Sequence, residues 1–189
     1  MSKIWLIALT SILAVASVIT PVFASSVHFK GDHSVPSFTD NTGTPNPLTL
    51  TTSGAISGLG FGDVNVTITA TAQPTATCGN PGTKLTQAPG QNPALVMVSG
   101  SVGIPANEVK NGNVAFSVTT SPPTNPIPGA PECPNSSWTE TITDLAFVSA
   151  TVTVQQPPGT VVLTASCSFS PPTTGGPVPS GNVSCTVTP

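Results

Sequence analysis

The stretch from Gly62 to Cys78, GDVNVTITATAQPTATC, constrains the fold of this chain more than any other stretch. After the turn pair Gly62-Asp63, apolar and polar side chains alternate one by one until Pro74 ends the alternation. A period of two is typical of a β-strand that has one buried and one solvated face. We therefore expect a strand whose inward side chains are Val64, Val66, Ile68, Ala70 and Ala72.

The remaining chain repeats this alternation between turns rich in glycine and proline. Further strands are predicted over residues 27–30, 48–56, 94–104, 113–120, 138–156, 161–169 and 182–188. Val161, Leu163, Ala165, Cys167 and Phe169 are expected on one inward face. We expect residues 48–56 to form a hairpin with the first stretch through the glycine-rich turn SGLGFG.

The segment 138–156 is long for one strand, and its apolar phase changes within it. A strict period of two cannot change phase without an irregularity, so we predict a bulge near residues 147–149. No amphipathic pattern of helix length follows residue 24. About eight strands at this spacing predict an all-β fold, an immunoglobulin-like antiparallel β-sandwich.

Residues 1–24 are predicted to be a cleaved signal peptide. Lys3 precedes the apolar run of residues 4–19, and Ala24 occupies a position suited to the cleavage site. The alternative is an uncleaved N-terminal anchor. We expect residues 25–189 to form a single domain that is secreted, extracellular and free of the membrane after cleavage.

Charged residues are sparse. Beyond residue 24 the only basic residues are Lys30, Lys84 and Lys110, against seven acidic residues, so the net charge there is −4. Nucleic-acid binding needs basic side chains that displace counterions, and this composition excludes it. The expected partner is an unknown extracellular protein or glycan, and no cofactor is predicted.

Four cysteines in an exported chain predict two disulfides, and the sequence allows more than one pairing. We favour Cys78–Cys133, which would join two loops at one end of the sandwich. We also favour Cys167–Cys185, on the inward faces of two strands joined by one loop. The alternative is metal ligation by thiolates, although the chain contains no C-x-x-C spacing.

Two histidines and two carboxylates occur close together near the start of the domain: His28, Asp32, His33 and Asp40. These residue types could form a hydrolytic or metal site. Surface residues beside a short strand are the alternative that we favour. The chain has no G-x-S-x-G elbow, H-E-x-x-H pair or P-loop, so we predict no catalytic or metal-binding residues and no enzyme activity.

Three sequons are candidate glycosylation sites, at Asn65, Asn135 and Asn182. In the predicted strands, Asn65 and Asn182 point outward, which would make them accessible to modification.

Several stretches carry a resemblance to known proteins: SVHF, LTLTTSGAISGLGFGDVNVTITATAQPTATC, QAPGQNP, KNGNVAFSVTT and CPNSSWTETITDLAFVSATVTV. Through them most of the chain resembles a group of small exported proteins of unknown function from archaea and soil bacteria. The resemblance implies export and a β domain, and it implies no activity.

We therefore expect a disulfide-stabilised extracellular module with a structural or binding role. One alternative is an exported hydrolase or metal-dependent enzyme that uses the region of His28 and His33. Another is a pilus-like surface subunit that donates a terminal strand to its neighbour, because strand addition needs only backbone complementarity.

Overall fold

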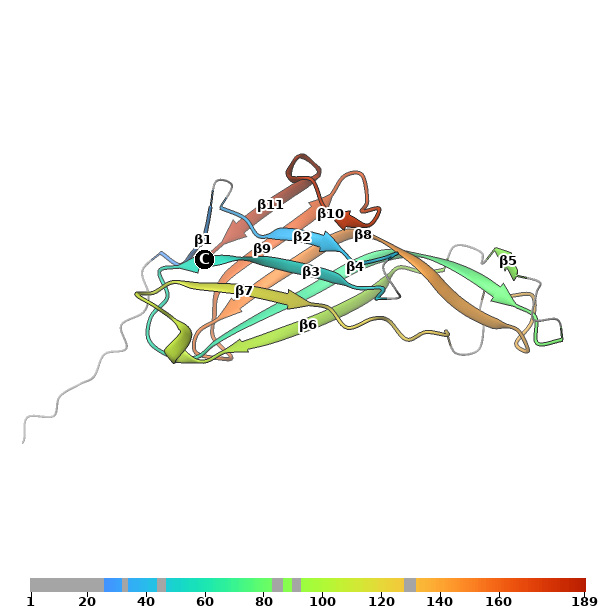
Figure 1. The fold of residues 1–189 in the computed structure, drawn as a ribbon, viewed down its shortest axis with the longest axis horizontal. Helices are drawn as coiled ribbons and strands as arrows, with labels where there is room; N and C mark the ends of the chain where they lie inside the picture. The colour runs from blue at the N-terminus through green and yellow to red at the C-terminus, as the bar shows by residue number, and fades with distance from the viewer. Residues whose placement is uncertain (1–25, 32–33, 44–46, 83–86, 90–92, 128–131) are drawn as a thin grey trace, which may run out of the picture.

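The computed structural model describes residues 26–31, 34–43, 47–82, 87–89, 93–127 and 132–189 (Figure 1). The predicted signal peptide and its cleavage site lie outside these residues. The chain is all-β, with two antiparallel sheets packed face to face. The two helices of the described part are short 3-10 turns, η1 (Ala106–Glu108) and η2 (Ser180–Asn182). No helix among the described residues has the length and hydrophobicity needed to cross a membrane.

The first sheet is organised around β3 (Leu50–Ser57). Along one edge of β3 lie β1 (His28–Lys30) and β2 (Ser37–Asp40), one after the other. Along the other edge lies β7 (Val114–Thr119), and β10 (Gly176–Pro177) pairs with β2.

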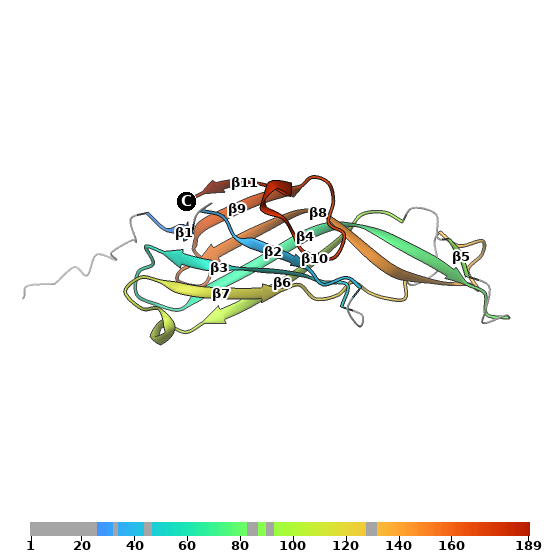
Figure 2. The same cartoon turned by 45° about the horizontal axis from the view of Figure 1, so that its top comes forward.

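The second sheet is organised around two long strands, β4 (Val64–Gly79) and β8 (Thr139–Gln155). On the far side of β8 follow β9 (Val161–Phe169) and then β11 (Val183–Thr188). Along the edge of β4 that faces away from β8 lie β6 (Val96–Ile104) and β5 (Gln87–Pro89). Figures 1 and 2 show that β4 and β8 extend beyond the first sheet as an arm, beside β5.

The alternation in β4 is confirmed, because its five predicted inward residues are all buried. The strand nevertheless continues through Pro74 to Gly79, so the predicted end at Pro74 is wrong. The pairing of β6 with β4 stops at Ala72, so one edge of β4 has no partner at Pro74. A residue without an N–H group can be accommodated there.

The predicted bulge in β8 is also confirmed. Thr71 pairs with Ser149 and Ala72 with Phe147, so that Val148 has no partner on β4. A second irregularity, which the sequence pattern does not predict, leaves Thr143 without a partner on β4. A third irregularity lies at the start of β9. Val161 is 54% exposed there, so the prediction that it faces the core is wrong.

The predicted hairpin is wrong, because β3 belongs to the first sheet and β4 to the second. The turn SGLGFG therefore crosses from one sheet to the other. Alternation shows which face of a strand is buried, but it fits any antiparallel neighbour equally well. Three short strands, β2, β5 and β10, also lie in segments predicted as loops. They are too short to show a period.

The core lies between the two sheets. Its largest fully buried apolar side chains are Phe29, Phe147, Leu50, Ile56, Ile68, Leu145 and Leu163. Near one long side of the sandwich, Phe38 of the first sheet meets Phe169 of the second, with ring centroids 5.1 Å apart in an edge-to-face arrangement. This geometry is favourable for aromatic pairs, and it holds the two sheets together beside β11.

Candidate functional site

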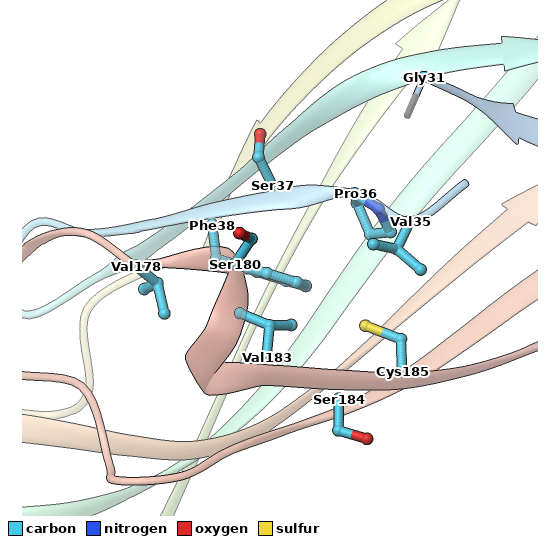
Figure 3. Close-up of a pocket in the computed structure, with 10 residues that line it drawn as sticks. All are labelled: Gly31, Val35, Pro36, Ser37, Phe38, Val178, Ser180, Val183, Ser184 and Cys185. Carbon is cyan, nitrogen blue, oxygen red and sulfur yellow. The ribbon is translucent and has the colours of Figure 1, made fainter. Parts of the chain in front are cut away.

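A groove runs between the edge of the first sheet and the edge strand β11 of the second, with a volume of about 540 Å³. We call it the β2–β11 groove. It is lined by Gly31, Val35, Pro36, Ser37, Phe38, Val178, Ser180, Val183, Ser184 and Cys185. Figure 3 shows Val183 and Cys185 directed from β11 toward Val35 and Pro36, whereas Ser184 points the other way. None of the described lining residues is charged, so this part of the groove suits an uncharged occupant.

The groove exists because β10 covers only part of β2. β10 pairs with Thr39 and Asp40, and the Val178 N–H then donates to the Phe38 carbonyl at 3.0 Å. The chain next passes through η2 into β11 of the second sheet. No described strand pairs with the edge of the first sheet beyond this point, near Val35 and Pro36.

A buried polar network fixes the β9–β10 connection that leads to the groove. Asp40 is buried, and one of its carboxylate oxygens accepts hydrogen bonds from the Thr173 hydroxyl and the Gly175 N–H. The other oxygen accepts from the Thr42 N–H at 2.9 Å. Thr173 in turn bonds the backbone N–H and carbonyl of Phe147, beside the bulge of β8. The bulge thus anchors the connection on which the shape of the groove depends.

The inward side chains of β11 are only half-buried, and those of β9 beside it are almost fully buried. Val183, Cys185 and Val187 pack against the core with partial exposure. By contrast, Cys167, which lies opposite Cys185 on β9, is 4% exposed. The difference arises because the first sheet does not reach over β11.

No described strand pairs with the outer edge of β11, so the hydrogen-bonding groups of its backbone are free there. The Ser170 N–H donates to the Asn182 carbonyl, and the register continues through Ser184–Ser168 and Thr186–Ser166. In an antiparallel pair, hydrogen-bonded and non-hydrogen-bonded residues alternate. The Cα distance of 4.0 Å between Cys167 and Cys185 agrees with a non-hydrogen-bonded pair there. Therefore the N–H and carbonyl groups of Val183, Cys185 and Val187 point away from β9.

Both favoured disulfides are present, and no cysteine is free. Cys167–Cys185 ties the edge strand β11 to β9 within one sheet. Cys78–Cys133 lies in the arm, where it joins the end of β4 to the segment before β8, with a Cα distance of 5.6 Å. One disulfide therefore holds the strand that borders the groove, and the other holds the arm.

The residues of the imagined hydrolytic or metal site are not brought together where the structure describes them. His28 is exposed on β1, with Nδ1 2.8 Å from the Ser26 carbonyl oxygen. Asp40 is buried in its own network, and Asp32 and His33 lie outside the described residues. Within the described part, no three His, Cys, Asp or Glu side chains are grouped so that they could hold a metal ion.

The three sequon asparagines occupy different environments. Asn65 is half-buried on the outer face of β4, and its side-chain nitrogen lies 3.3 Å from the Gln155 amide oxygen. Asn135 is exposed in a turn, where its side chain accepts a bond from the Ser137 N–H. Asn182 lies in η2 and not in the last strand, which corrects the predicted position. Glycosylation at these sites stays a prediction.

A second surface feature is an exposed phenylalanine in the turn between β3 and β4. Gly60 and Gly62 flank Phe61, and the buried Gln156 side chain holds both of them. The Gly60 N–H donates to Gln156 Oε1 at 2.7 Å, and Gln156 Nε2 donates to the carbonyls of Gly60 and Gly62. The turn is therefore fixed in shape while the ring of Phe61 is fully exposed.

No pattern in the sequence directly indicates the groove or the fixed turn. The groove combines residues 31–38 with residues 178–185, which are far apart in the chain and lie mostly in predicted loops. A usable signal was the C-terminal strand VSCTVT, which contains no charge and no proline. Natural edge strands are commonly protected from further pairing by charged side chains or proline, and this strand has neither. Comparisons of the chain with protein-family models, with curated proteins and with solved structures found no match.

Proposed function

We propose that this chain is an exported, non-catalytic binding module that accepts an extended strand of a partner polypeptide in the β2–β11 groove. The observation that carries the proposal is a free strand edge bordering an uncharged groove with a partly apolar lining. In strand addition, backbone hydrogen bonds supply affinity, and pockets for alternate side chains supply specificity. β11 offers the backbone groups, and the groove offers the pocket.

A polypeptide strand fits this site better than a glycan does. The described lining contains no carboxylate, amide or basic side chain that could bind sugar hydroxyls directionally. The Ser37 hydroxyl is already bonded to Ser53, and the ring of Phe38 is buried against Phe169. An extended strand needs only the backbone groups at the edge and small apolar side chains at every second position.

The wider setting of the proposal is extracellular. Two disulfides are typical of oxidising compartments, and they fit an exported chain. An immunoglobulin-like identity is proposed from the antiparallel two-sheet architecture alone, and membership of the resembled group of exported proteins is proposed from the sequence. No contact of the described residues favours catalysis in the region of His28 and His33. The groove favours the accepting role in strand addition over the donating role.

The test uses an acetylated and amidated hexapeptide of alternating valine and threonine as a neutral model strand. We expect calorimetric titration to show binding to the wild type. Val187→Pro should weaken binding at least about tenfold, because proline removes an N–H group at the free edge. Val187→Ala is the matched control, since it keeps this N–H group.

Two outcomes would overturn the proposal. One is the absence of peptide binding to the folded, monomeric wild type at millimolar peptide. The other is equal binding to the proline and alanine variants, with the fold retained in both. Far-ultraviolet circular dichroism and thermal unfolding establish whether each variant is folded.

A further inference from the structure

The edge strand β11 carries a palindromic pattern of side chains. From either end, residues 183–187 read as valine, hydroxyl residue, cysteine, hydroxyl residue and valine. When a strand pairs with a copy of itself across a twofold axis, residue i contacts residue j and j contacts i. About Cys185, β11 would therefore place valine opposite valine and a hydroxyl residue opposite a hydroxyl residue.

We propose that the groove edge accepts β11 of a second copy of this chain, paired antiparallel across a twofold axis. The inference rests on the proposed function and names the partner at that site. Cys185 would lie opposite the partner's Cys185, Val183 opposite the partner's Val187, and Ser184 opposite the partner's Thr186. The second sheets of two copies would then form one continuous sheet.

The backbone of β11 supports this register. The residues with free N–H and carbonyl groups are Val183, Cys185 and Val187, and centring on Cys185 pairs all three of them within the strand. A shift of the centre to Ser184 or Thr186 would leave one of the three without a partner in the opposing β11. The register centred on Cys185 therefore makes the most hydrogen bonds between the two β11 strands.

The side chains support the same register. Each Val183 would lie beside the partner's Val187 on the inner face, and both side chains are half-exposed in the single chain. On the outer face, Ser184 would meet the partner's Thr186, and paired hydroxyl residues are favourable across strands. No charged residue occurs in β11 or among the described residues of the groove lining, so two copies of β11 meet there without like-charge repulsion.

Sedimentation over a concentration series tests the inference with two matched double variants. Ser184→Lys with Thr186→Lys places lysine opposite lysine twice in the predicted register, and dimer formation should weaken at least about tenfold. Ser184→Lys with Thr186→Glu places lysine opposite glutamate twice and should keep the dimer. Val187→Pro should also give monomers, whereas Val187→Ala should leave more dimer than Val187→Pro does.

The outcomes separate this inference from the proposed function. A wild type that stays monomeric up to millimolar concentration but binds the valine–threonine hexapeptide overturns the inference alone. A wild type that neither dimerises nor binds the hexapeptide overturns both. A dimer that responds equally to the two charge variants, or not at all to Val187→Pro, uses another surface, and the inference is then wrong.

Discussion

The two long sides of the sandwich differ in how the sheets meet. On one side, the edge strands β6 and β7 approach closely, and the Ser121 N–H donates to the Ser99 carbonyl across the sheets at 2.8 Å. Gly100 makes this approach possible, since a Cβ atom there would lie 2.0 Å from the Thr119 carbonyl oxygen. On the other side, β11 extends past the first sheet and leaves the β2–β11 groove.

The two edge strands of the second sheet, β6 and β11, therefore differ in how accessible their backbones are to another strand. β6 has its backbone close to the opposite sheet, so no further strand can be inserted between them. β11 keeps its backbone groups free, has no charge or proline, and borders apolar residues. An unprotected edge of this kind is a template for pairing with another chain. The close approach at Ser99 and Ser121 thus leaves β11 as the more open of these two edges.

The largest expected effect comes from replacing a valine by aspartate in the edge strand on each side. Val98→Asp places a carboxylate in the buried core beneath β6, and it should cost about 4 kcal/mol of unfolding free energy. Val183→Asp on half-buried β11 should cost about 1 kcal/mol, because water can reach the new carboxylate. Chemical denaturation with the disulfides intact measures both losses. Equal losses would show that the groove side is as closed as the β6 side.

Gly100→Ala should cost about 3 kcal/mol, because the added methyl group collides with the backbone of Thr119 and forces β6 and β7 apart. Gly103→Ala is the matched control on the same strand, since a Cβ atom there meets nothing within 4 Å. Thermal unfolding of the two variants compares them directly. A similar stability for both would contradict the close approach of the sheets on this side.

Asp40→Ala should cost about 2 kcal/mol, because it leaves the Thr42 and Gly175 N–H groups and the Thr173 hydroxyl without their acceptor. Asp144→Ala removes an exposed carboxylate and should change stability by less than about 0.5 kcal/mol. Amide hydrogen exchange should locate the loss of Asp40→Ala in β10 and the β9–β10 connection. A loss of protection confined to the β6–β7 side would contradict the assigned role.

The smallest effect is expected for a proline at the free edge. Val187→Pro should change the unfolding free energy by less than about 1 kcal/mol, because its N–H points away from β9. Thr186→Pro, one residue earlier, removes a hydrogen bond within the sheet and should cost about 3 kcal/mol. Thermal unfolding distinguishes the two. The reverse order of stability would place the free backbone groups on the other set of residues.

The sequence by itself determined which residues of the long strands face inward. β4, β7 and most of β9 follow their alternation, and the phase change in β8 correctly predicted a bulge. The pairing of Cys167 with Cys185 was also inferable, since both cysteines lie on inward positions of strands joined by one loop. These features are local, because each depends on a period or spacing within one stretch of chain.

Only the tertiary structure decided which strands pair and where the sandwich is left open. The chain crosses between sheets at residues 58–63 instead of turning back in a hairpin, since alternation specifies a buried face but no neighbour. The groove depends on the short strand β10, on the Asp40–Thr173 contact and on the way β11 extends past the first sheet. These are contacts between residues more than a hundred positions apart or in segments too short to show a period. Such contacts form only when the two sheets pack, and no pattern within a single stretch encodes them.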